Sequence, residues 1–166
     1  MITLYNVVSA DGYIADENGQ EDFIPEEVWG DFLDICRENE VVVFGRKTYE
    51  AIQRYSSNLI QDFEDLNIKK VVVTDNKKFI VKPVYEIIYS IDGIKSLGKN
   101  ILVSSGPTLN DSLLKTGMVD NIVLNKLSEK IGTGIKPFTD ILNLTPVSEK
   151  NIRIGQTMSI YKVNVT

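Results

Sequence analysis

The sequence predicts an α/β protein built on a largely parallel sheet, and three features carry that prediction. Short apolar segments rich in Val and Ile, typical of buried strands, recur along the chain. Amphipathic segments that favour helices separate these strands through the first two-thirds of the chain, as parallel pairing requires. After Asp120 the pattern changes to strands and turns, which predicts an antiparallel finish at an edge of the sheet.

Seven segments have the β-branched and aromatic composition of strands and are bounded by turn-forming residues. In chain order the predicted strands are Ile2–Val8, Val41–Phe44, Lys70–Thr74, Val84–Tyr89, Ile101–Ser104, Asn121–Leu127 and Met158–Val165. Four helices are predicted between them, over Pro25–Arg37, Thr48–Arg54, Ser90–Leu97 and Thr108–Lys115. The first of these helices opens with Pro and two glutamates and carries a broad apolar face, so we expect it to pack against the sheet.

A chain of 166 residues with 43% hydrophobic and 25% charged residues predicts a single globular domain over residues 1–166. Its net charge of −5 argues against a nucleic-acid or anionic-membrane surface, because both need a basic field. No apolar run approaches the ~18 residues of a membrane span, and the first residues resemble a strand rather than a leader peptide. We therefore expect a cytoplasmic protein.

The chain has no histidine, which excludes histidine triads, histidine-ligated metals and imidazole acid–base catalysis. We predict no metal site. The single cysteine, Cys36, lies among apolar residues and is expected in the core rather than as a nucleophile. A proton donor must therefore be Asp, Glu, Tyr, Lys or a bound water.

The most informative segment follows the predicted strand Val41–Phe44. Gly45 breaks the strand, Arg46 and Lys47 come next, and Thr48 begins the following helix. Free N–H groups at a helix start suit a phosphate, and two cations can add charge-assisted bonds to it. The alternative is a solvated turn in which Thr48 serves only as an N-cap.

A second strand–helix junction, rich in small residues, comprises Ser104, Ser105, Gly106, Pro107, Thr108 and Leu109. Small side chains let a ligand approach the backbone, although a plain turn would use the same residues. Because both junctions follow the carboxyl ends of strands, they predict a ligand crevice beyond that edge of the sheet.

Other turns also lie at strand ends. Thr74-Asp75-Asn76 suits a ribose or a phosphate, or simply forms a solvated turn. Ser9-Ala10-Asp11-Gly12 contains an Asp-Gly turn signal and would hang residues 16–22 over the mouth of the sheet. Gly132-Thr133-Gly134 lacks the third glycine and the helix of a dinucleotide fingerprint, so we discard that interpretation.

Five motifs occur along the chain in one order: Ser9-Ala10-Asp11-Gly12-Tyr13-Ile14-Ala15, Gly45-Arg46-Lys47-Thr48-Tyr49-Glu50, Gly106-Pro107-Thr108-Leu109, Val119-Asp120 before a strand, and Gly132-Thr133-Gly134-Ile135-Lys136-Pro137-Phe138. Together they resemble the dihydrofolate-reductase-like superfamily, specifically the reductase domain of riboflavin biosynthesis and its stand-alone relatives. The resemblance implies a three-layer α/β fold, in which a twisted, mostly parallel sheet has helices on both faces and an antiparallel C-terminal hairpin.

The resemblance also implies NADPH as the cofactor. Its phosphates would be held by Gly45-Arg46-Lys47-Thr48, and Thr74-Asp75-Asn76 would lie near the adenosine ribose phosphate. Ser104-Ser105-Gly106-Pro107-Thr108-Leu109 would lie by the pyrophosphate and the nicotinamide. Ser9, Asp11 and Gly12 would belong to the active-site loop that meets the substrate.

Glu27 is the first candidate for a proton donor. Ile24-Pro25-Glu26-Glu27-Val28-Trp29 resembles the start of the helix that carries an acidic residue in dihydrofolate reductases. A carboxyl group in an apolar pocket can keep its proton near neutral pH, as Glu27 would beside Val28 and Trp29. Acids in a first helical turn are also common simply because they complement the helix dipole. Asp11 is the second candidate.

We therefore expect an NADPH-dependent reductase that acts on a C=N or C=O bond of a small pterin or aminopyrimidine, similar to 5-amino-6-(5-phosphoribosylamino)uracil reductase. Dihydrofolate reductase proper is the first alternative, and a non-catalytic nucleotide- or pterin-binding module is the second. The riboflavin-pathway enzymes carry an arginine before their cofactor loop, and between Gly12 and Gly45 this chain offers only Arg37.

A homodimer is expected as well. Met158–Val165 alternates apolar and polar residues and would form a long exposed edge in an isolated chain, which proteins usually cover. Relatives in the riboflavin-reductase group often dimerise through their C-terminal regions, so the resemblance implies an interface near Asn121–Leu127 and Met158–Val165. The alternative is a monomer whose last strand pairs internally.

Overall fold

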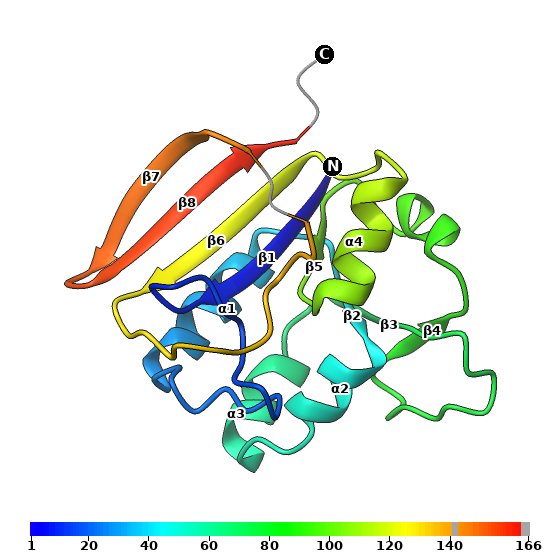
Figure 1. Ribbon diagram of the computed structural model, residues 1–166. Coiled ribbons are helices and arrows are strands. Elements are labelled where there is room, and N and C mark those ends of the chain that lie inside the picture. The colour runs from blue at the N-terminus through cyan, green and yellow to red at the C-terminus, as the bar shows by residue number, and fades with distance from the viewer. Residues whose placement is uncertain (141–142, 164–166) are drawn as a thin grey trace.

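The computed structural model describes residues 1–140 and 143–163, which form an eight-stranded sheet with helices around it (Figure 1). The strands are β1 (Ile2–Val8), β2 (Val41–Gly45), β3 (Lys69–Val73), β4 (Glu86–Ile88), β5 (Ile101–Val103), β6 (Asn121–Leu127), β7 (Pro146–Arg153) and β8 (Gln156–Lys162). The helices are α1 (Glu27–Arg37), α2 (Arg46–Ile52), α3 (Ser57–Glu64), the 3₁₀ helix η1 (Ile91–Ser96) and α4 (Pro107–Lys115).

Across the sheet the strand order is β4-β3-β2-β5-β1-β6-β8-β7. The strands from β4 to β6 pair in parallel, and the C-terminal β8 and β7 pair antiparallel. In this register Val103 of β5 lies between Val43 of β2 and Leu4 of β1, so these strands end at the same edge of the sheet. The predicted fold class, a mostly parallel sheet with an antiparallel C-terminal hairpin, is confirmed.

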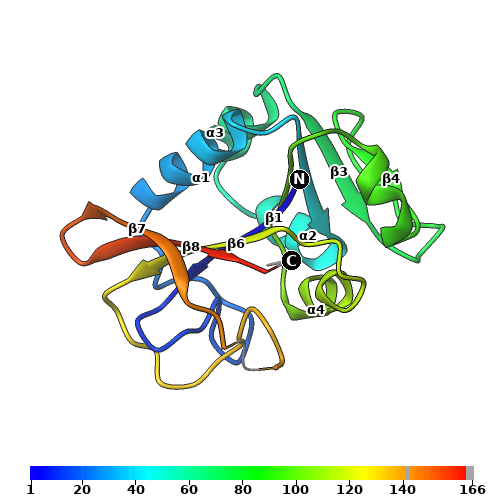
Figure 2. The same cartoon turned by 90° about the horizontal axis from the view of Figure 1, so that it is seen from above.

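Helices cover both faces of the sheet and make three layers, as the view from above shows (Figure 2). Side chains alternate along β2: Val42 and Phe44 pack with α1 and α3, whereas Val41 and Val43 pack with α4 and η1. Cys36 is fully buried on the α1 side, and burial raises the pKa of its thiol, so the expected core position is confirmed. Within the described residues, no helix is long and apolar enough to cross a membrane.

The sequence pattern misses two elements. α3 spans only about two turns and buries Ile60 and Phe63, so its amphipathic pattern is too short to identify a helix by periodicity. β7 is exposed along most of its length and shows no apolar alternation. The predicted helix Ser90–Leu97 is instead a single 3₁₀ segment containing Gly93, a residue that disfavours an α-helix interior.

β8 is not an edge strand, contrary to the expectation for Met158–Val165. It pairs with β6 on one side and with β7 on the other, and residues 164–165 lie outside the described residues. The edge strand at this end of the sheet is β7, which carries the exposed Glu149 and Lys150 and has two register shifts, features that discourage pairing with a second chain. The edge argument for a dimer was therefore wrong, and the dimer itself stays a prediction.

An ion pair fastens the C-terminal hairpin to α1. Arg153 donates two hydrogen bonds to the carboxylate of Asp31, at 2.6 and 2.8 Å, and Gln156 donates a third at 2.7 Å. Burial alone would raise the pKa of Asp31, but these hydrogen bonds outweigh burial and hold the pKa below its ordinary value. The hairpin therefore has an electrostatic anchor on the helix in addition to its strand pairing.

We expect Asp31→Asn to lower the free energy of unfolding by about 1–2 kcal/mol at pH 7, because charged hydrogen bonds are lost from a partly exposed pair. Asp31 has a lower pKa in the folded protein than in the unfolded chain. Its contribution is therefore present above the unfolded pKa of ~3.9 and is lost as the pH falls through the folded value. Urea unfolding from pH 7 to pH 3 should show the two proteins converging at low pH.

The matched control is Asp34→Asn on the same helix, because Asp34 is 76% exposed and pairs only with Arg37 three residues away. That variant should change stability by less than about 0.5 kcal/mol. Equal effects of the two substitutions would contradict the anchor.

We expect light scattering at micromolar concentration to give twice the 18.7 kDa mass of one chain. Since β7 is protected as an edge, the dimer would use a face of the C-terminal sheet region rather than strand addition. A mass near 18.7 kDa would contradict the dimer.

Candidate functional site

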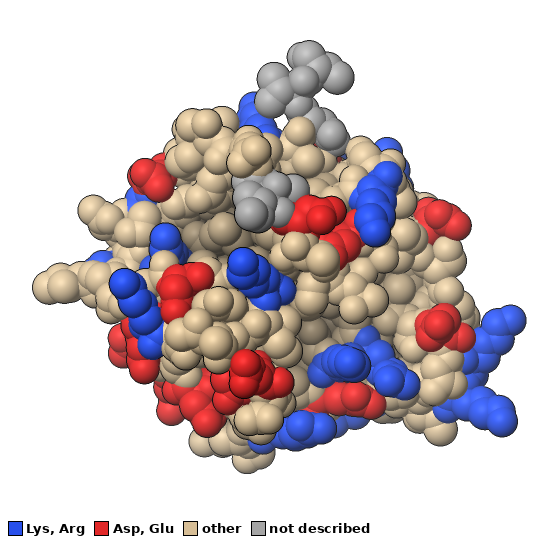
Figure 3. Space-filling view, in the orientation of Figure 1, with Lys and Arg blue, Asp and Glu red and all other residues tan. Residues whose placement is uncertain are grey.

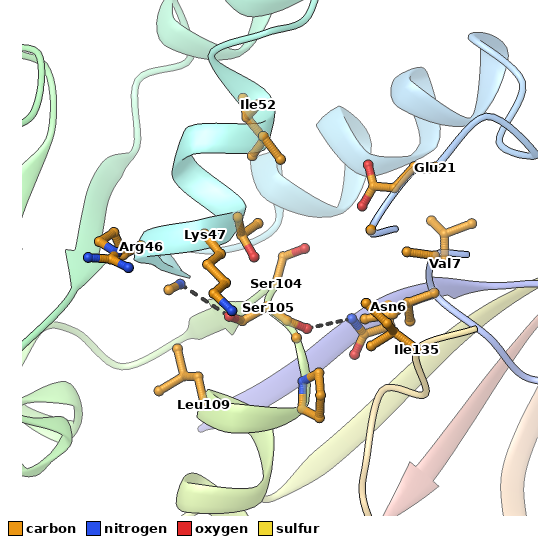
Figure 4. A pocket seen from close by; sticks show the side chains of 18 of the residues that line it. Asn6, Val7, Glu21, Arg46, Lys47, Ile52, Ser104, Ser105, Leu109 and Ile135 are labelled. Carbon is orange, nitrogen blue, oxygen red and sulfur yellow. Dashed lines mark hydrogen bonds between the residues drawn. The ribbon is translucent and has the colours of Figure 1, made fainter. Parts of the chain in front are cut away.

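A cavity of about 1120 Å³ opens at the edge of the sheet where the parallel strands end. Its wall combines the ends of β2 and β5, the starts of α2 and α4, one side of α1, and the loop between β1 and α1 (Figure 4). The crevice predicted from the two strand–helix junctions is therefore present in the fold.

The first junction begins where Gly45 ends β2 and α2 starts at Arg46. Gly45 is extended, and the first turn of α2 has no side-chain cap, so its N–H groups are available to a ligand. The N–H of Gly45 itself donates to the Ser105 hydroxyl at 3.2 Å. A Cβ at Gly45 would lie 2.8 Å from that oxygen, so a larger residue would displace the Ser105 hydroxyl from this contact.

The second junction is held from below by two buried amide side chains. The carbonyl oxygen of Ser105 accepts hydrogen bonds from Asn6 at 2.8 Å and from Asn110 at 3.1 Å. Asn110 also donates to the side chain of Asn6 and to the carbonyl of Pro137, each at 3.0 Å. The Oδ1 atom of Asn110 has no hydrogen-bond partner in the part of the chain that the structure describes. The backbone before α4 is thereby fixed.

Arg46 and Lys47 are exposed and line the cavity from the first turn of α2. Lys47 extends toward the Ser104–Ser105 segment, whereas Arg46 is turned away from it (Figure 4). Basic side chains gather over α2 and over the loop beyond β3 on the face that Figure 3 shows. Among residues 1–140 and 143–163, neither Arg46 nor Lys47 forms an ion pair, so both charges are free to meet an anion.

Most of the predicted cofactor residues share this wall. The residues from Gly45 to Thr48 and from Ser104 to Leu109 line the cavity, as do Thr74 and Asp75 at the end of β3. Asn76 lies outside it. Asn6 was missed by the sequence interpretation, although an amide inside the apolar strand Ile2–Val8 was a usable signal.

The predicted loop residues Ser9, Asp11 and Gly12 lie outside the cavity wall, and their contact with a substrate stays a prediction. The Ser9 hydroxyl donates to Asp11 at 2.6 Å, and the N–H groups of Ile131 and Gly132 donate to the same carboxylate at 3.2 and 2.8 Å. The Ser9 bond, followed by these backbone bonds, lowers the pKa of Asp11 to about 2. Asp11 therefore fastens a loop, and its hydrogen bonds favour the ionised form of the carboxyl group.

The apolar pocket expected around Glu27 is absent as well. Glu27 is exposed at the start of α1 and lies outside the cavity wall, while Val28 and Trp29 point into the fold. The structure therefore corrects the prediction of a carboxyl group in an apolar pocket at this position. The first-turn location of Glu27 matches the alternative interpretation, in which the acid complements the helix dipole.

A different carboxyl group lies in the cavity. Glu21, in the loop before α1, is half-buried and accepts a 2.5 Å hydrogen bond from the Tyr55 hydroxyl. Burial raises the pKa of Glu21, and the bond from Tyr55 offsets only part of that effect. The sequence interpretation treated residues 16–22 as a covering loop, and nothing in their pattern separates Glu21 from its acidic neighbours.

Aromatic side chains surround this end of the cavity. The ring of Trp29 lies 5.1 Å from that of Phe32 and 5.2 Å from that of Tyr55, measured between centroids. The indole N–H of Trp29 donates to the carbonyl of Leu59 at 3.0 Å, which fixes the ring. In the described part of the chain, no group of three or more metal-binding side chains gathers.

Sequence comparisons identify distant relatives. No family model matches the chain. Two curated proteins of Bacillus subtilis strain 168, both uncharacterised, are similar along nearly their whole length. YwjB is 25% identical over 172 residues, which cover 96% of this chain and 95% of that protein. YyaP is 24% identical over 178 residues, which cover 98% and 95%.

Solved structures share the fold at low sequence identity. A Shewanella sp. PV-4 protein provisionally assigned to riboflavin biosynthesis has a TM-score of 0.77 at 19% identity, with 97% of both chains covered. The Thermotoga maritima deaminase and 5-amino-6-(5-phosphoribosylamino)uracil reductase has a TM-score of 0.71 at 14% identity, with 98% of this chain and 56% of that one covered. Enterococcus faecalis dihydrofolate reductase has a TM-score of 0.72 at 15% identity, with 98% and 95% covered. This protein therefore has the dihydrofolate-reductase-like fold.

Proposed function

We propose that this protein is an NADPH-dependent reductase that acts on a C=N or C=O bond of a small pterin or aminopyrimidine, as in the riboflavin pathway. The observation that supports the proposal is one cavity that joins two anion-suited junctions to an aromatic wall bearing the Glu21 carboxyl group. Its volume of about 1120 Å³ slightly exceeds the ~300–1,000 Å³ of ordinary small-molecule sites, as a cavity for two ligands would.

The junction residues fit a dinucleotide. The uncapped N–H groups of α2, the ammonium group of Lys47 and the small residues before α4 offer the donors and the close backbone approach that a pyrophosphate needs. Arg46 would add a charge for the 2′-phosphate of NADPH. The cofactor would supply a hydride, and the protein would bind and orient both reactants.

Two proteins of the same fold support the choice of cofactor and substrate. The Thermotoga protein is named as a reductase of 5-amino-6-(5-phosphoribosylamino)uracil, and the Enterococcus enzyme is a dihydrofolate reductase complexed with NADP(H). Dihydrofolate reduction is therefore the first alternative for this chain. A non-catalytic binding module is the second, and the exposed position of Glu27 is the observation that favours it.

We expect purified protein to oxidise NADPH in the presence of an aminopyrimidine or a dihydropterin, followed as the loss of absorbance at ~340 nm. Reactions without substrate or with boiled protein should show no such loss. The panel should hold 5-amino-6-(5-phosphoribosylamino)uracil, dihydrofolate and unsubstituted dihydropterin. Turnover of dihydrofolate alone would favour the first alternative. Tight NADPH binding without turnover of any compound would favour the binding module.

We expect NADPH to bind at least tenfold more tightly than NADH, because pairing of Arg46 with the 2′-phosphate is worth ~1–3 kcal/mol. Quenching of Trp29, the single tryptophan, reports binding without turnover. Arg46→Ala should lose most of the preference, and Arg37→Ala, on α1 and outside the cavity wall, should keep it. Equal affinities for NADPH and NADH would contradict the assignment of Arg46 to the 2′-phosphate. Asp75 could then bind a ribose hydroxyl instead.

A further inference from the structure

Glu21 and Tyr55 form a hydrogen-bonded pair in the cavity wall, although they belong to two segments far apart in the sequence. Glu21 belongs to the loop between β1 and α1, and Tyr55 belongs to the connection between α2 and α3. The hydroxyl of Tyr55 donates to the Glu21 carboxylate at 2.5 Å, and both residues line the cavity. In Figure 4 the Glu21 carboxyl group is directed toward the space between α2 and β1.

The surroundings of this pair favour a carboxyl group that keeps its proton. Trp29 packs edge-on against the Tyr55 ring and excludes water from one side of the pair. The charged residues of the cavity wall that neighbour this pair in the sequence are Asp22 on the same loop, Glu26 before α1 and Arg54 after α2, and all three are exposed. None of them bonds to Glu21, so the desolvation of the carboxyl group is offset by Tyr55 alone.

We propose that Glu21, held by Tyr55, is the catalytic acid of the reduction and gives its proton to a nitrogen atom of a planar heterocycle seated against Trp29. This inference rests on the proposed function, since it names the residue that completes that reaction. It assigns the role to a loop carboxyl group rather than to Glu27 on α1 or to Asp11, because neither of those lines the cavity.

The step balances with one hydride and one proton. The carbon atom of the C=N bond receives the hydride and forms a C–H bond, and the π pair moves to nitrogen. Nitrogen takes the proton from the Glu21 O–H group, so that C=N becomes CH–NH and the nicotinamide is left oxidised. The Glu21 carboxylate, which accepts the Tyr55 hydrogen bond, is then reprotonated from water.

The first test is the pH dependence of kcat/KM with NADPH and the best substrate of the panel. An acid must be protonated to act, so the wild-type rate should fall as the pH rises through the pKa of Glu21, which burial raises. Glu21→Gln should lower kcat by about a hundredfold or more and abolish this limb of the profile. Its affinity for NADPH should stay within about twofold of wild type, because the acid acts in the transition state.

The variant Tyr55→Phe should shift the pKa of Glu21 in a direction that a purely structural role of Tyr55 would not produce. The hydroxyl stabilises the charged form of Glu21, so its removal should raise the pKa of Glu21 further. The falling limb of the profile should therefore move to higher pH, and the rate on the alkaline side should increase relative to the maximum. The matched control is Glu17→Gln, since Glu17 lies on the same loop but is exposed and outside the cavity wall.

A second readout does not need turnover. The ring of Trp29 contacts that of Tyr55, so its fluorescence should titrate with Glu21, with a midpoint above the ~4.3 of an ordinary glutamate. The transition should be lost in Glu21→Gln, displaced upward in Tyr55→Phe and unchanged in Glu17→Gln.

Four results would overturn the assignment. A normal rate profile in Glu21→Gln would remove the acid role even though the enzyme is active, and loss of the limb in Glu27→Gln instead would return that role to α1. A titration of Trp29 that persists in Glu21→Gln would show that another group governs this end of the cavity. Absence of wild-type turnover with the whole panel, beside a normal Trp29 titration, would instead refute the proposed function and with it the catalytic role.

Discussion

The carbonyl oxygen of Ser105 is buried just beyond β5, where it accepts hydrogen bonds from the side-chain amides of Asn6 and Asn110. Without partners a buried carbonyl would cost about 1–3 kcal/mol, so the two amides stabilise one conformation of this junction over its alternatives. The hydroxyl of the same residue accepts the N–H of Gly45. The two strand–helix junctions that line the cavity are thereby held in contact.

The cavity has two chemically different ends. The cations of α2 and the helix starts make one end suitable for an anion, and no described acid neutralises Arg46 or Lys47. At the other end, which carries the Trp29 and Tyr55 rings, burial raises the pKa of Glu21. Under the proposed function, a charged cofactor tail would bind at the first end and a planar ring at the second, which is the orientation a reduction needs.

Two acidic residues, one of them the catalytic candidate Asp11, join separate parts of the fold. Asp11 ties the loop after β1 to the backbone at Ile131 and Gly132, and Asp31 ties α1 to Arg153 of the hairpin. Both carboxylates accept several hydrogen bonds, which lower the pKa and keep the group ionised. A carboxylate held in this way is a poor proton donor. Glu21 accepts one hydrogen bond and burial raises its pKa, so it is better suited to keep and donate a proton.

Local patterns in the sequence determined the strand–helix alternation, the parallel sheet and the two junctions at Gly45 and Ser105, because each depends on residues close together in the chain. The tertiary structure alone decided which carboxyl group enters the cavity. The pKa of a carboxyl group depends on its burial and its partners, and the partner of Glu21 is Tyr55, 34 residues away. The role of Asp11 could not be predicted either, because its backbone partners Ile131 and Gly132 are distant from it in the sequence.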